Sequence, residues 1–303
     1  MPTILVIGSI NMDQVMTLPH WPEVGESIIG TTLSYSPGGK GANAAIAAAR
    51  LGASVRFAGC VGKDDFGQAL RRTLEDEGIS TSLLRASGEA ATGLAPILVS
   101  AGGENIVIVY PGANMLLRQE DLPAMFQGQI DALMMQLEIP QPVILAASRM
   151  AAQKGIPVVL DAGPAQRFPV EEMEGLFILS PNETECTALS GLPVGSLDET
   201  RLAARSLFER TKARYVVVKM GARGAYIYGE GIDRHLPAFT VKAVDPTAAG
   251  DAFTGAMTIE YLRCGDIERA VRYGCAAGAI AATKLGAQPS LPSAQAVEAF
   301  LRG

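Results

Sequence analysis

The sequence predicts an α/β fold with a mostly parallel central sheet and a small β-sheet lid. Short apolar runs rich in β-branched residues alternate with alanine-rich helical patterns along most of the 303 residues, which is typical of βαβ units. Two β-rich segments interrupt this alternation, and no crossover helix follows either of them at once. Apolar residues make up 48% of the chain, enough for a large buried core. Because no linker, repeat or low-complexity tract divides the chain, we expect one α/β domain over residues 1–303.

The individual elements follow from the apolar pattern. The predicted strands cover residues 3–7, 55–60, 132–136, 157–161, 177–180 and 215–219. The helices predicted between them cover residues 42–51, 67–77, 142–153 and 198–211. The C-terminal third is predicted to be helical over residues 252–264, 267–285 and 293–301. Alternation of this kind predicts crossover connections between parallel strands.

Residues 14–34 and 92–110 are the two segments that break the rhythm. Both contain β-rich sequence, with turn residues at 22–25 and 101–104. We expect a small sheet built from about 13–36 and 91–112. Beside an active face, such a sheet is a natural lid that closes over a ligand and excludes water. The alternative is an extra antiparallel edge of the main sheet.

Composition excludes several classes of function. A net charge of −6 and a pI near 5.1, without a Lys/Arg cluster, argue against a nucleic-acid partner. His20 and His235 are the only histidines, too few for a His-based triad or a multi-His metal site. The four cysteines form no C-x-x-C pair, which indicates a reduced, cytoplasmic protein. We find neither a signal peptide nor an apolar run of membrane-spanning length.

The segment Asp-Pro-Thr-Ala-Ala-Gly-Asp at 245–251 carries the strongest signal, because its small residues lead into a helix predicted to start near Asp251. Orphan amides and the macrodipole at a helix start favour an anion, and small side chains let it approach closely. A carboxylate there is explained if Asp251 takes a proton from a hydroxyl that attacks phosphorus. The dipole should lower the pKa of Asp251, but a loose transition state tolerates a weak base. The alternative is that Asp251 is only a helix N-cap.

The segment Pro-Gly-Gly-Lys-Gly-Ala-Asn at 37–43 opens an alanine-rich helix. Its glycines would let the backbone approach a small polyhydroxylated ligand, with Lys40 and Asn43 as donors. Its G-x-G-x-x-A pattern, with Asp64 downstream, is also a partial dinucleotide fingerprint. A plain helix N-terminus is the third interpretation.

Polar residues also follow several predicted strands, where ligands of open α/β sheets gather. Asn11 and Asp13 follow the first strand and Glu138 follows another, and these side chains suit the hydroxyl groups of a sugar. After a later strand, Asn182 and Glu185 would lie near phosphates or the water shell of Mg²⁺, unless they form only a capping box. The glycine-rich turn at 219–224 would hold a nucleotide against backbone, unless it is an ordinary β-turn.

Together, and in this order, these motifs resemble the ribokinase-type carbohydrate kinase family from residue 4 to about 301. Gly-Gly-Lys-Gly-Ala-Asn at 38–43 and Ala-Ala-Gly-Asp at 248–251 are specific to that family. Asn-x-Asp at 11–13, Gln-Leu-Glu at 136–138 and Gly-Ala-Gln-Pro-Ser at 286–290 point to its ribose-phosphorylating branch. The resemblance implies a three-layer α/β/α catalytic domain that transfers the γ-phosphate of ATP to the 5-hydroxyl of D-ribose. Deoxyribose, another pentose, a ketohexose or a nucleoside is the alternative substrate.

The resemblance also implies residue roles. Asp251 would be the base, and the backbone amides of Ala248, Ala249 and Gly250 would form an anion hole. The sugar ligands would be Asn11, Asp13, Gly39, Lys40, Asn43 and Glu138. The ATP ligands would be Asn182, Lys219, Gly221, Gly224 and Cys275, with Glu185 holding Mg²⁺ through water. An activating K⁺ would be held, mostly by backbone carbonyls, at Asp245, Thr247, Ala281, Lys284, Gly286 and Ser290. Homodimerisation through the lid is also implied.

The sequence departs from the family's pattern at four places. Cys275 stands where histidine is expected, and Lys219 where threonine is frequent. Asp161 begins a segment that replaces the usual Asn-Pro-Ala-Pro-Ala, and Pro246 lies inside the K⁺ loop.

Two other classes of protein stay open. One is a dinucleotide-dependent oxidoreductase, which titration with NAD(H) would reveal. The other is a non-catalytic regulator that binds a sugar or nucleotide, which ATP turnover with a sugar panel would exclude.

Overall fold

The computed structural model describes residues 1–303 and contains a nine-stranded central sheet. In spatial order its strands are β13 (Ile232–Leu236), β12 (Ala225–Gly229), β11 (Tyr215–Lys219), β10 (Leu176–Ser180), β9 (Val158–Asp161), β8 (Ala132–Met135), β1 (Thr3–Ile7), β4 (Ser54–Gly62) and β5 (Ser80–Ser87). Neighbouring strands from β11 to β5 pair in parallel, whereas β12 and β13 are antiparallel at one edge. The mostly parallel sheet is therefore confirmed, while β5, β12 and β13 were not among the predicted strands.

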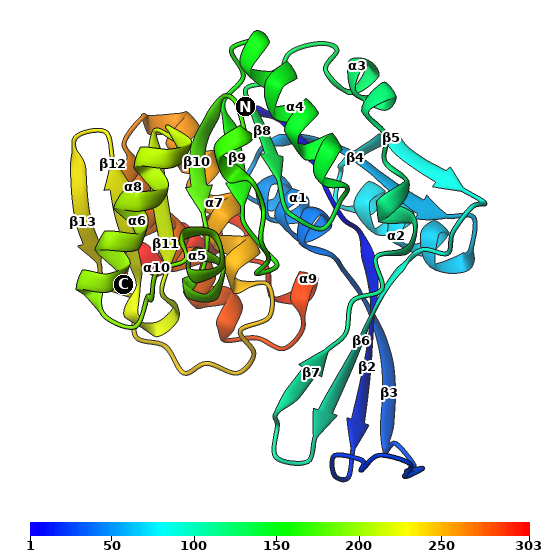
Figure 1. Ribbon diagram of the computed structural model, residues 1–303. Helices are drawn as coiled ribbons and strands as arrows, with labels where there is room; N and C mark the ends of the chain where they lie inside the picture. Colours follow the sequence, from blue (N-terminus) through cyan, green and yellow to red (C-terminus); the bar gives the residue numbers. More distant parts are fainter.

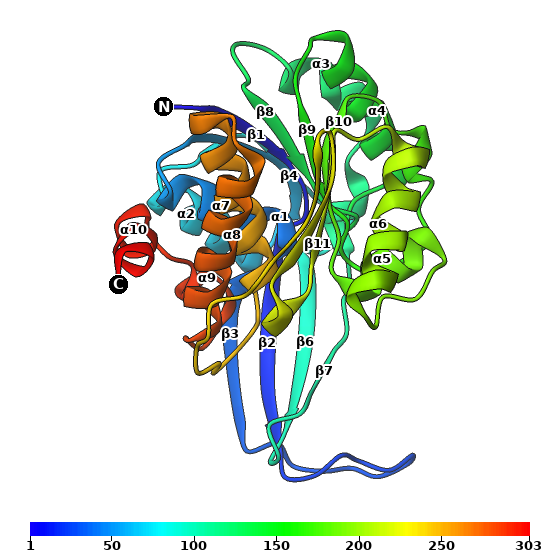
Figure 2. The same ribbon diagram turned by 90° about the vertical axis from the view of Figure 1, so that its left-hand side faces the viewer.

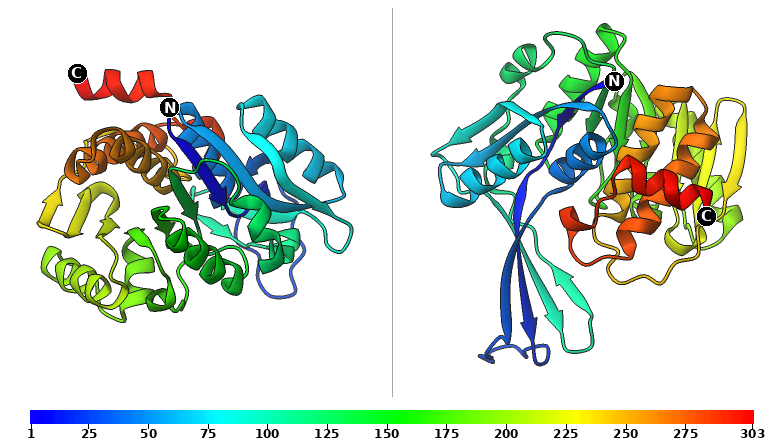
Figure 3. Two further views of the ribbon diagram at one scale, coloured as in Figure 1. Left: turned by 90° about the horizontal axis from the view of Figure 1, so that it is seen from above. Right: turned by 180° about the vertical axis from the view of Figure 1, so that it is seen from behind.

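Helices cover both faces of the sheet, which gives the three layers (Figures 2 and 3). One face carries α1 (Lys40–Arg50), α2 (Asp65–Asp76), α7 (Ala249–Cys264), α8 (Ile267–Ala282), α9 (Ala287–Ser290) and α10 (Ala294–Arg302). The other face carries α3 (Leu122–Met125), α4 (Gln141–Gln153), α5 (Glu183–Ser190) and α6 (Leu197–Thr211). Short 3₁₀ turns complete the set: η1 (Gly112–Leu116), η2 (Gln119–Asp121), η3 (Val170–Glu172) and η4 (Gly221–Arg223).

The core is divided by the sheet into two apolar clusters. Along β1, Ile4 and Val6 belong to one cluster, and Leu5 and Ile7 belong to the other. Successive side chains of a strand point to opposite faces, so a strand buried on both faces must be apolar throughout. This is why the central strands appear in the sequence as continuous apolar runs. No helix of the chain is long and apolar enough to cross a membrane.

A second, four-stranded sheet projects from the body beside the N-terminal half of the central sheet (Figure 1). Its order is β3 (Thr32–Gly38), β2 (Asn11–Leu18), β6 (Gly93–Ser100) and β7 (Asn105–Val107). The prediction of a separate small sheet drawn from two places in the sequence is thus confirmed. Strand β2 starts only four residues after β1 ends, so its first residues lie where the two sheets meet.

Two helix boundaries differ from the prediction for a local reason. Helix α7 begins at Ala249 rather than near Asp251, because Ala248 adopts a left-handed conformation (φ 59°) and acts as the N-cap. Asp251 is therefore inside the first turn, and its interpretation as the N-cap is wrong. Helix α8 ends at Ala282 rather than at residue 285, because the Ala282 carbonyl accepts from the amides of Val244 and Asp245.

Candidate active site

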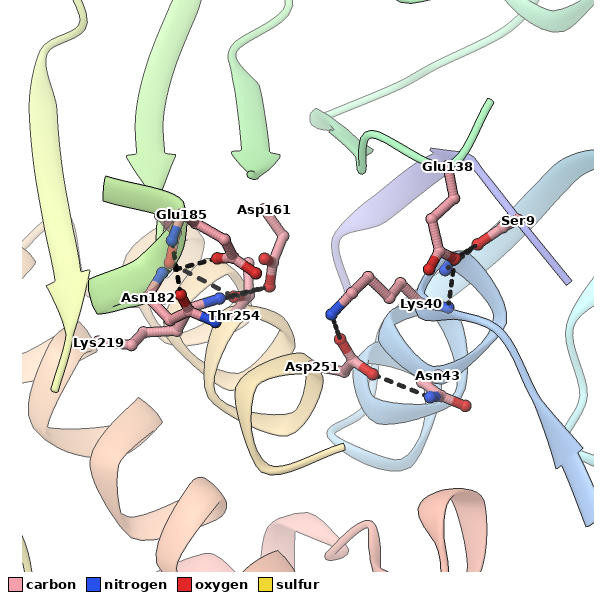
Figure 4. A network of polar contacts seen from close by, with 12 residues as sticks. Ser9, Lys40, Asn43, Glu138, Asp161, Asn182, Glu185, Lys219, Asp251 and Thr254 are labelled. Atoms are coloured by element: carbon pink, nitrogen blue, oxygen red, sulfur yellow. Dashed lines mark hydrogen bonds and ion pairs between the residues drawn. The ribbon is translucent and has the colours of Figure 1, made fainter. Parts of the chain in front are cut away.

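The predicted site residues gather beyond the carboxyl ends of the parallel strands, where the first turns of α1 and α7 and the base of the small sheet meet (Figure 4). Asp161 and Lys219 end β9 and β11, and Lys40 begins α1. Figure 4 shows one polar group around Lys40 and Asp251, and a second around Lys219 and Asp161. This edge of the sheet is where the sequence predicted ligand binding.

Asp251 is a buried carboxylate in the first turn of α7. Its Oδ2 accepts a hydrogen bond of 2.9 Å from Asn43 Nδ2, and its Oδ1 lies 4.0 Å from Lys40 Nζ. The other side-chain atom of Asn43, Oδ1, is buried without a partner. Helices α1 and α7 can approach this closely because Gly255 faces Ala47, where an added Cβ would lie only 2.9 Å from the Ala47 Cβ.

Burial raises the pKa of Asp251 above the ordinary carboxyl value, and the positive charge of Lys40 only partly opposes this shift. The expectation that the helix dipole makes Asp251 a weak base is therefore wrong, because desolvation of the carboxylate dominates. A buried carboxylate with a raised pKa is a better proton acceptor than an exposed one. Lys40, which faces Asp251, Asp161, Glu138 and Glu185, has its pKa raised although burial opposes that shift.

The amides at the start of α7 lack a capping side chain. The amides of Ala248 and Gly250 donate to no backbone carbonyl, whereas the amide of Ala249 donates to the Pro246 carbonyl at 3.1 Å. Ala249 is thus satisfied within its own turn, and two of the three predicted anion-hole amides are free. Free amides at the positive end of a 16-residue helix attract an anion.

Near Lys40, two more predicted residues, Glu138 and Asp13, face the same space as Asp251. Glu138 accepts from the Ser9 hydroxyl and, at 3.4 Å, from the Lys40 amide. Asp13 lies in β2, and burial together with repulsion from Glu138 and Asp251 raises its pKa to about 7. The carboxyl groups of Asp13, Glu138 and Asp251 therefore lie close enough to repel one another, which suits a ligand that brings many hydroxyl donors and no negative charge.

Asn11 and Gly39 complete this side of the site. Asn11 Oδ1 accepts a 2.7 Å hydrogen bond from Asn114 Nδ2. Gly39 has a φ of 91°, and a Cβ there would lie 2.7 Å from the Asn11 amide nitrogen. Only glycine allows the chain before α1 to cross β2 this closely. The predicted sugar ligands Asn11, Asp13, Gly39, Lys40, Asn43 and Glu138 are thus brought together.

A cavity of about 370 Å³ lies on the other side of the first turn of α7. Its lining is mostly apolar and includes the predicted ATP ligands Lys219, Gly221, Gly224 and Cys275, together with Gly250. Burial raises the pKa of the Cys275 thiol to about 11, so this cysteine is a neutral part of the wall. An apolar chamber that ends at a lysine and a helix start fits a flat base at one end and phosphates at the other.

Asn182 and Glu185 form the capping box that was the alternative interpretation. Asn182 Oδ1 accepts from the Glu185 amide at 2.9 Å, and Glu185 Oε2 accepts from the Asn182 amide at 2.7 Å. The cap leaves Asn182 Nδ2 and Glu185 Oε1 available to a ligand. Burial and repulsion from Asp161 raise the pKa of Glu185. Unlike the other predicted ATP ligands, Asn182 does not line the cavity described above.

Asp161 and Lys219, two of the departures from the family pattern, form a buried ion pair of 2.7 Å. The Thr254 hydroxyl donates to the same Asp161 oxygen at 2.8 Å. Burial alone would raise the pKa of Asp161, but Lys219 and Lys40 outweigh it and hold that pKa below its ordinary value. The two residues that depart from the expected pattern are therefore in direct contact.

The predicted K⁺ positions come from two loops that the fold brings together. Asp245 Oδ1 accepts from the Thr247 amide at 2.9 Å, and Asp245 Oδ2 accepts from the Gly286 amide at 2.9 Å. Of the other positions, Ala281 lies in the last turn of α8, Lys284 and Gly286 lie in the connection that follows it, and Ser290 ends α9. Burial would raise the pKa of Asp245, but these hydrogen bonds hold it below its ordinary value. An ionised carboxylate is one of the hard oxygen ligands that a cation such as K⁺ requires.

The partial dinucleotide fingerprint is not supported by its surroundings. Asp64 caps α2 and accepts from the amides of Gly67 and Thr92 and from the Thr92 hydroxyl at 2.6–2.8 Å. Its oxygens are thus committed to the protein rather than to a ribose. In addition, β1 leads into the small sheet, not into a helix.

Three residues that sequence reasoning missed shape the site. Asn114 holds Asn11 and also accepts from the Ile10 amide at 3.0 Å. Ser9 bridges Glu138 and the Gly41 amide, and Thr254 lies one turn after Gly250 on α7. The position of Thr254 follows from helical spacing, whereas the contacts of Asn114 with Asn11 and of Ser9 with Glu138 join residues more than 100 positions apart.

Comparison with known proteins gives the class to which this fold and site belong. The model of the pfkB family carbohydrate kinases matches residues 1–294. The chain therefore belongs to that family and is an ATP-dependent sugar kinase.

Within the family the similarity is to ribokinases in particular. The ribokinase of Haemophilus influenzae is 38% identical over 99% of this chain and 98% of its own. A deoxyribokinase of Salmonella typhi is 34% identical over 98% of each chain. The structure of Arabidopsis thaliana ribokinase complexed with ribose and ATP superposes with a TM-score of 0.87, at 29% identity, over 100% of this chain and 99% of that one.

Proposed function

We propose that the protein is a ribokinase that transfers the γ-phosphate of ATP to the 5-hydroxyl of D-ribose, with Asp251 as the base. One observation carries the proposal: the first turn of α7, which bears the buried carboxylate of Asp251, lies between two spaces with different chemistry. The polar space holds Asn43 and Lys40, and the apolar cavity ends at Lys219 and Gly250. A sugar hydroxyl and a triphosphate that approach from the two sides would meet at Asp251.

Each side chain has a separate task in this reaction. Asn43, Lys40, Glu138, Asp13 and Asn11 would orient the sugar, and Asp251 would take the proton as the hydroxyl oxygen attacks the phosphorus. The Lys40 charge would stabilise Asp251 while it is still ionised. Phosphoryl transfer depends mainly on such positioning and on charge stabilisation, because its transition state is loose.

The amides of Ala248 and Gly250 would stabilise the charge on the transferring group. Loss of one such donor typically costs about 3 kcal/mol of transition-state stabilisation. The amide of Ala249 would join them only if its bond to Pro246 opened. The turn from Lys219 to Gly224, with Cys275, would hold ATP, and Asn182 Nδ2 would donate to its phosphates.

Two metal ions belong to the proposal. When bound to the phosphates, Mg²⁺ neutralises part of their charge. Glu185 Oε1, which the capping box leaves free, is the nearby oxygen that would hold its water shell. K⁺ would be held beside the start of α7 by Asp245 and the carbonyl groups of the two loops that Asp245 joins, where it would fix the position of the anion hole.

The small sheet is proposed to be both a lid and a dimer contact, appended to one catalytic domain of residues 1–303. Asp13 lies in β2, so closure of the sheet would move a sugar ligand directly. The outer strands expose Leu33, Tyr35, Ile106 and Val107, each about half accessible to solvent. Exposed apolar side chains on sheet strands favour pairing with a second copy. We place the protein in the cytoplasm, because its four cysteines are free thiols and its co-substrate is ATP.

A coupled assay of ADP formation with a panel of sugars, with and without K⁺, tests the function. We expect the highest kcat/KM with D-ribose and activation by K⁺. The deoxyribokinase relative makes 2-deoxyribose the second candidate. A higher kcat/KM with deoxyribose would move the assignment to that sugar. ATP and sugar binding without turnover would instead indicate a non-catalytic regulator.

A further inference from the structure

Lys219 and Asp161 lie on either side of β10, at the ends of strands β11 and β9. Their side chains are 11% and 2% exposed, and the Lys219 Nζ to Asp161 Oδ2 distance is 2.7 Å. Thr254 Oγ1, from α7, lies 3.5 Å from the same ammonium. Three elements thus hold the ammonium group in one place (Figure 4).

The ion pair is incomplete, which argues against a purely structural role. Asp161 Oδ1 is buried and has no hydrogen-bond partner. The ammonium has three N–H groups, and Asp161 and Thr254 are its only acceptors. A buried ion pair repays its desolvation only when the remaining hydrogen-bonding positions are satisfied. Because both partners keep unused hydrogen-bonding groups, a ligand from outside the chain is needed to complete the site.

The open side of Lys219 faces the start of α7. A Cβ placed on Gly250 would lie 3.6 Å from Lys219 Nζ, and both residues line the 370 Å³ cavity. The free amide of Gly250 and the positive end of the helix macrodipole lie beside this ammonium. Two positive groups side by side repel each other unless an anion lies between them. The ligand for which this corner is built is therefore anionic.

We propose that Lys219 binds the β- and γ-phosphates of ATP together with the Gly250 amide, and that Asp161 is the positioning residue that holds its ammonium there. This rests on the proposed function, in which ATP occupies the cavity. Because the ammonium has three donors, it keeps Asp161 while it binds a phosphate oxygen. Asp161 then has two opposite effects: it fixes the lysine for phosphoryl transfer, and its own negative charge weakens phosphate binding.

The two effects predict a distinctive pattern for substitutions. Lys219→Met removes the phosphate ligand and leaves Asp161 unpaired, so ADP and ATP bind at least about 10- to 100-fold more weakly, the range of a charge-assisted hydrogen bond. Asp161→Asn leaves nucleotide affinity unchanged or higher but lowers kcat, because the ammonium is no longer fixed. The double variant Asp161→Asn/Lys219→Met binds ADP more tightly than Lys219→Met alone, since the unpaired carboxylate is gone.

Equilibrium binding of adenosine, ADP and ATP to the full chain, by calorimetry, tests the proposal. Adenosine has no phosphate, so its affinity should be the same in all variants. Lys154→Met is the matched control: it removes the same charge from an exposed lysine at the end of α4, and should change nothing. If Lys219→Met fails to fold, the double variant, which has no unpaired buried carboxylate, still tests the loss of ADP affinity against the wild type.

The outcomes separate this inference from the proposed function. Wild-type protein that binds neither adenosine nor ATP would overturn both. Wild-type binding of ATP combined with an equal loss of adenosine and ADP affinity in the lysine variants would overturn the phosphate role alone. Unchanged ADP affinity in Lys219→Met, or tighter binding by the single variant than by the double, would overturn it as well.

Discussion

Replacement of Asp251 by asparagine removes a proton acceptor while it keeps the shape of the side chain. The amide oxygen of an asparagine can still accept from Asn43 Nδ2, as Asp251 Oδ2 does at 2.9 Å. What disappears is the negative charge 4.0 Å from Lys40 Nζ. At an effective dielectric constant of 20 that attraction is about 4 kcal/mol, which is similar to the several kcal/mol that burial of a carboxylate costs.

Because burial outweighs the attraction to Lys40, we expect the free energy of unfolding to stay the same or to rise, by no more than about 1 kcal/mol. Tm should then shift by roughly 2–4 °C or less. Catalysis should change far more. A general base contributes about 10²- to 10⁴-fold, so kcat should fall at least about 100-fold, which is roughly 2.7 kcal/mol of activation free energy. The KM for the sugar should stay close to that of the wild type.

The measurement is steady-state kinetics of ADP formation, combined with thermal unfolding of the same samples. Asp198→Asn is a matched control, because Asp198 is an exposed carboxylate in the first turn of another helix, α6. It should lose some tenths of a kcal/mol of stability through the helix dipole and no activity. Turnover by Asp251→Asn within a few-fold of the wild type would refute the assignment of Asp251 as the base.

Further predictions follow from neighbouring parts of the site. Gly250→Ala should raise Tm, because alanine is favoured over glycine in a helix by about 0.5–1 kcal/mol and the new methyl group meets nothing closer than 3.6 Å. The same variant should lower kcat at least tenfold, because its methyl group lies in the path of the phosphate, and a fall in both Tm and kcat would contradict this explanation. Asp13, with a pKa of about 7, should bind sugar hydroxyls more strongly once it ionises, so the sugar KM should fall as pH rises through 7, and Asp13→Asn should raise the KM and remove this dependence. The effect of pH on stability has the opposite sign. Because folding raises the pKa of Asp13 from 3.8, the contribution of Asp13 to stability is fully present below pH 4 and is lost as the pH rises through 7. Asp13→Asn should therefore raise the Tm of the sugar-free protein relative to the wild type at pH 8 and not at pH 4. Asp245→Asn should reduce activation by K⁺ relative to Na⁺ without loss of ATP binding; equal activation in variant and wild type would remove Asp245 from the cation site.

Much of the fold could be predicted because it depends on local patterns. Strands buried on both faces of a sheet must be apolar throughout, and amphipathic crossover helices must follow them, so β1, β8 and α6 were found within about one residue of their bounds. The strands β12 and β13 were missed. Strand β13, at the edge of the sheet, is mostly polar and mostly accessible to solvent, so it leaves no continuous apolar run. Strand β12 is apolar and mostly buried, but it follows β11 in an antiparallel pair without the crossover helix that the expected alternation requires.

For the site, the sequence alone determined the identity of the chemical groups: glycines before a helix, small residues before a carboxylate, and polar side chains after strands. These signals are local, because turns, caps and helix starts are built from neighbouring residues. The tertiary structure decided which groups share a space. Asn43 meets Asp251 across 208 residues, and Lys219 meets Asp161 across 58, through side-by-side packing of helices and strands that no local pattern records.

Only the tertiary structure decided the charges as well. From the sequence, the helix dipole predicted a lowered pKa for Asp251, but burial raises it, because desolvation depends on every chain segment that covers the carboxylate. Likewise, Asp161 and Lys219 look like two unrelated departures from a family pattern until the sheet places their side chains 2.7 Å apart. Local sequence determines which groups are present, while burial and electrostatic pairing are properties of the folded chain as a whole.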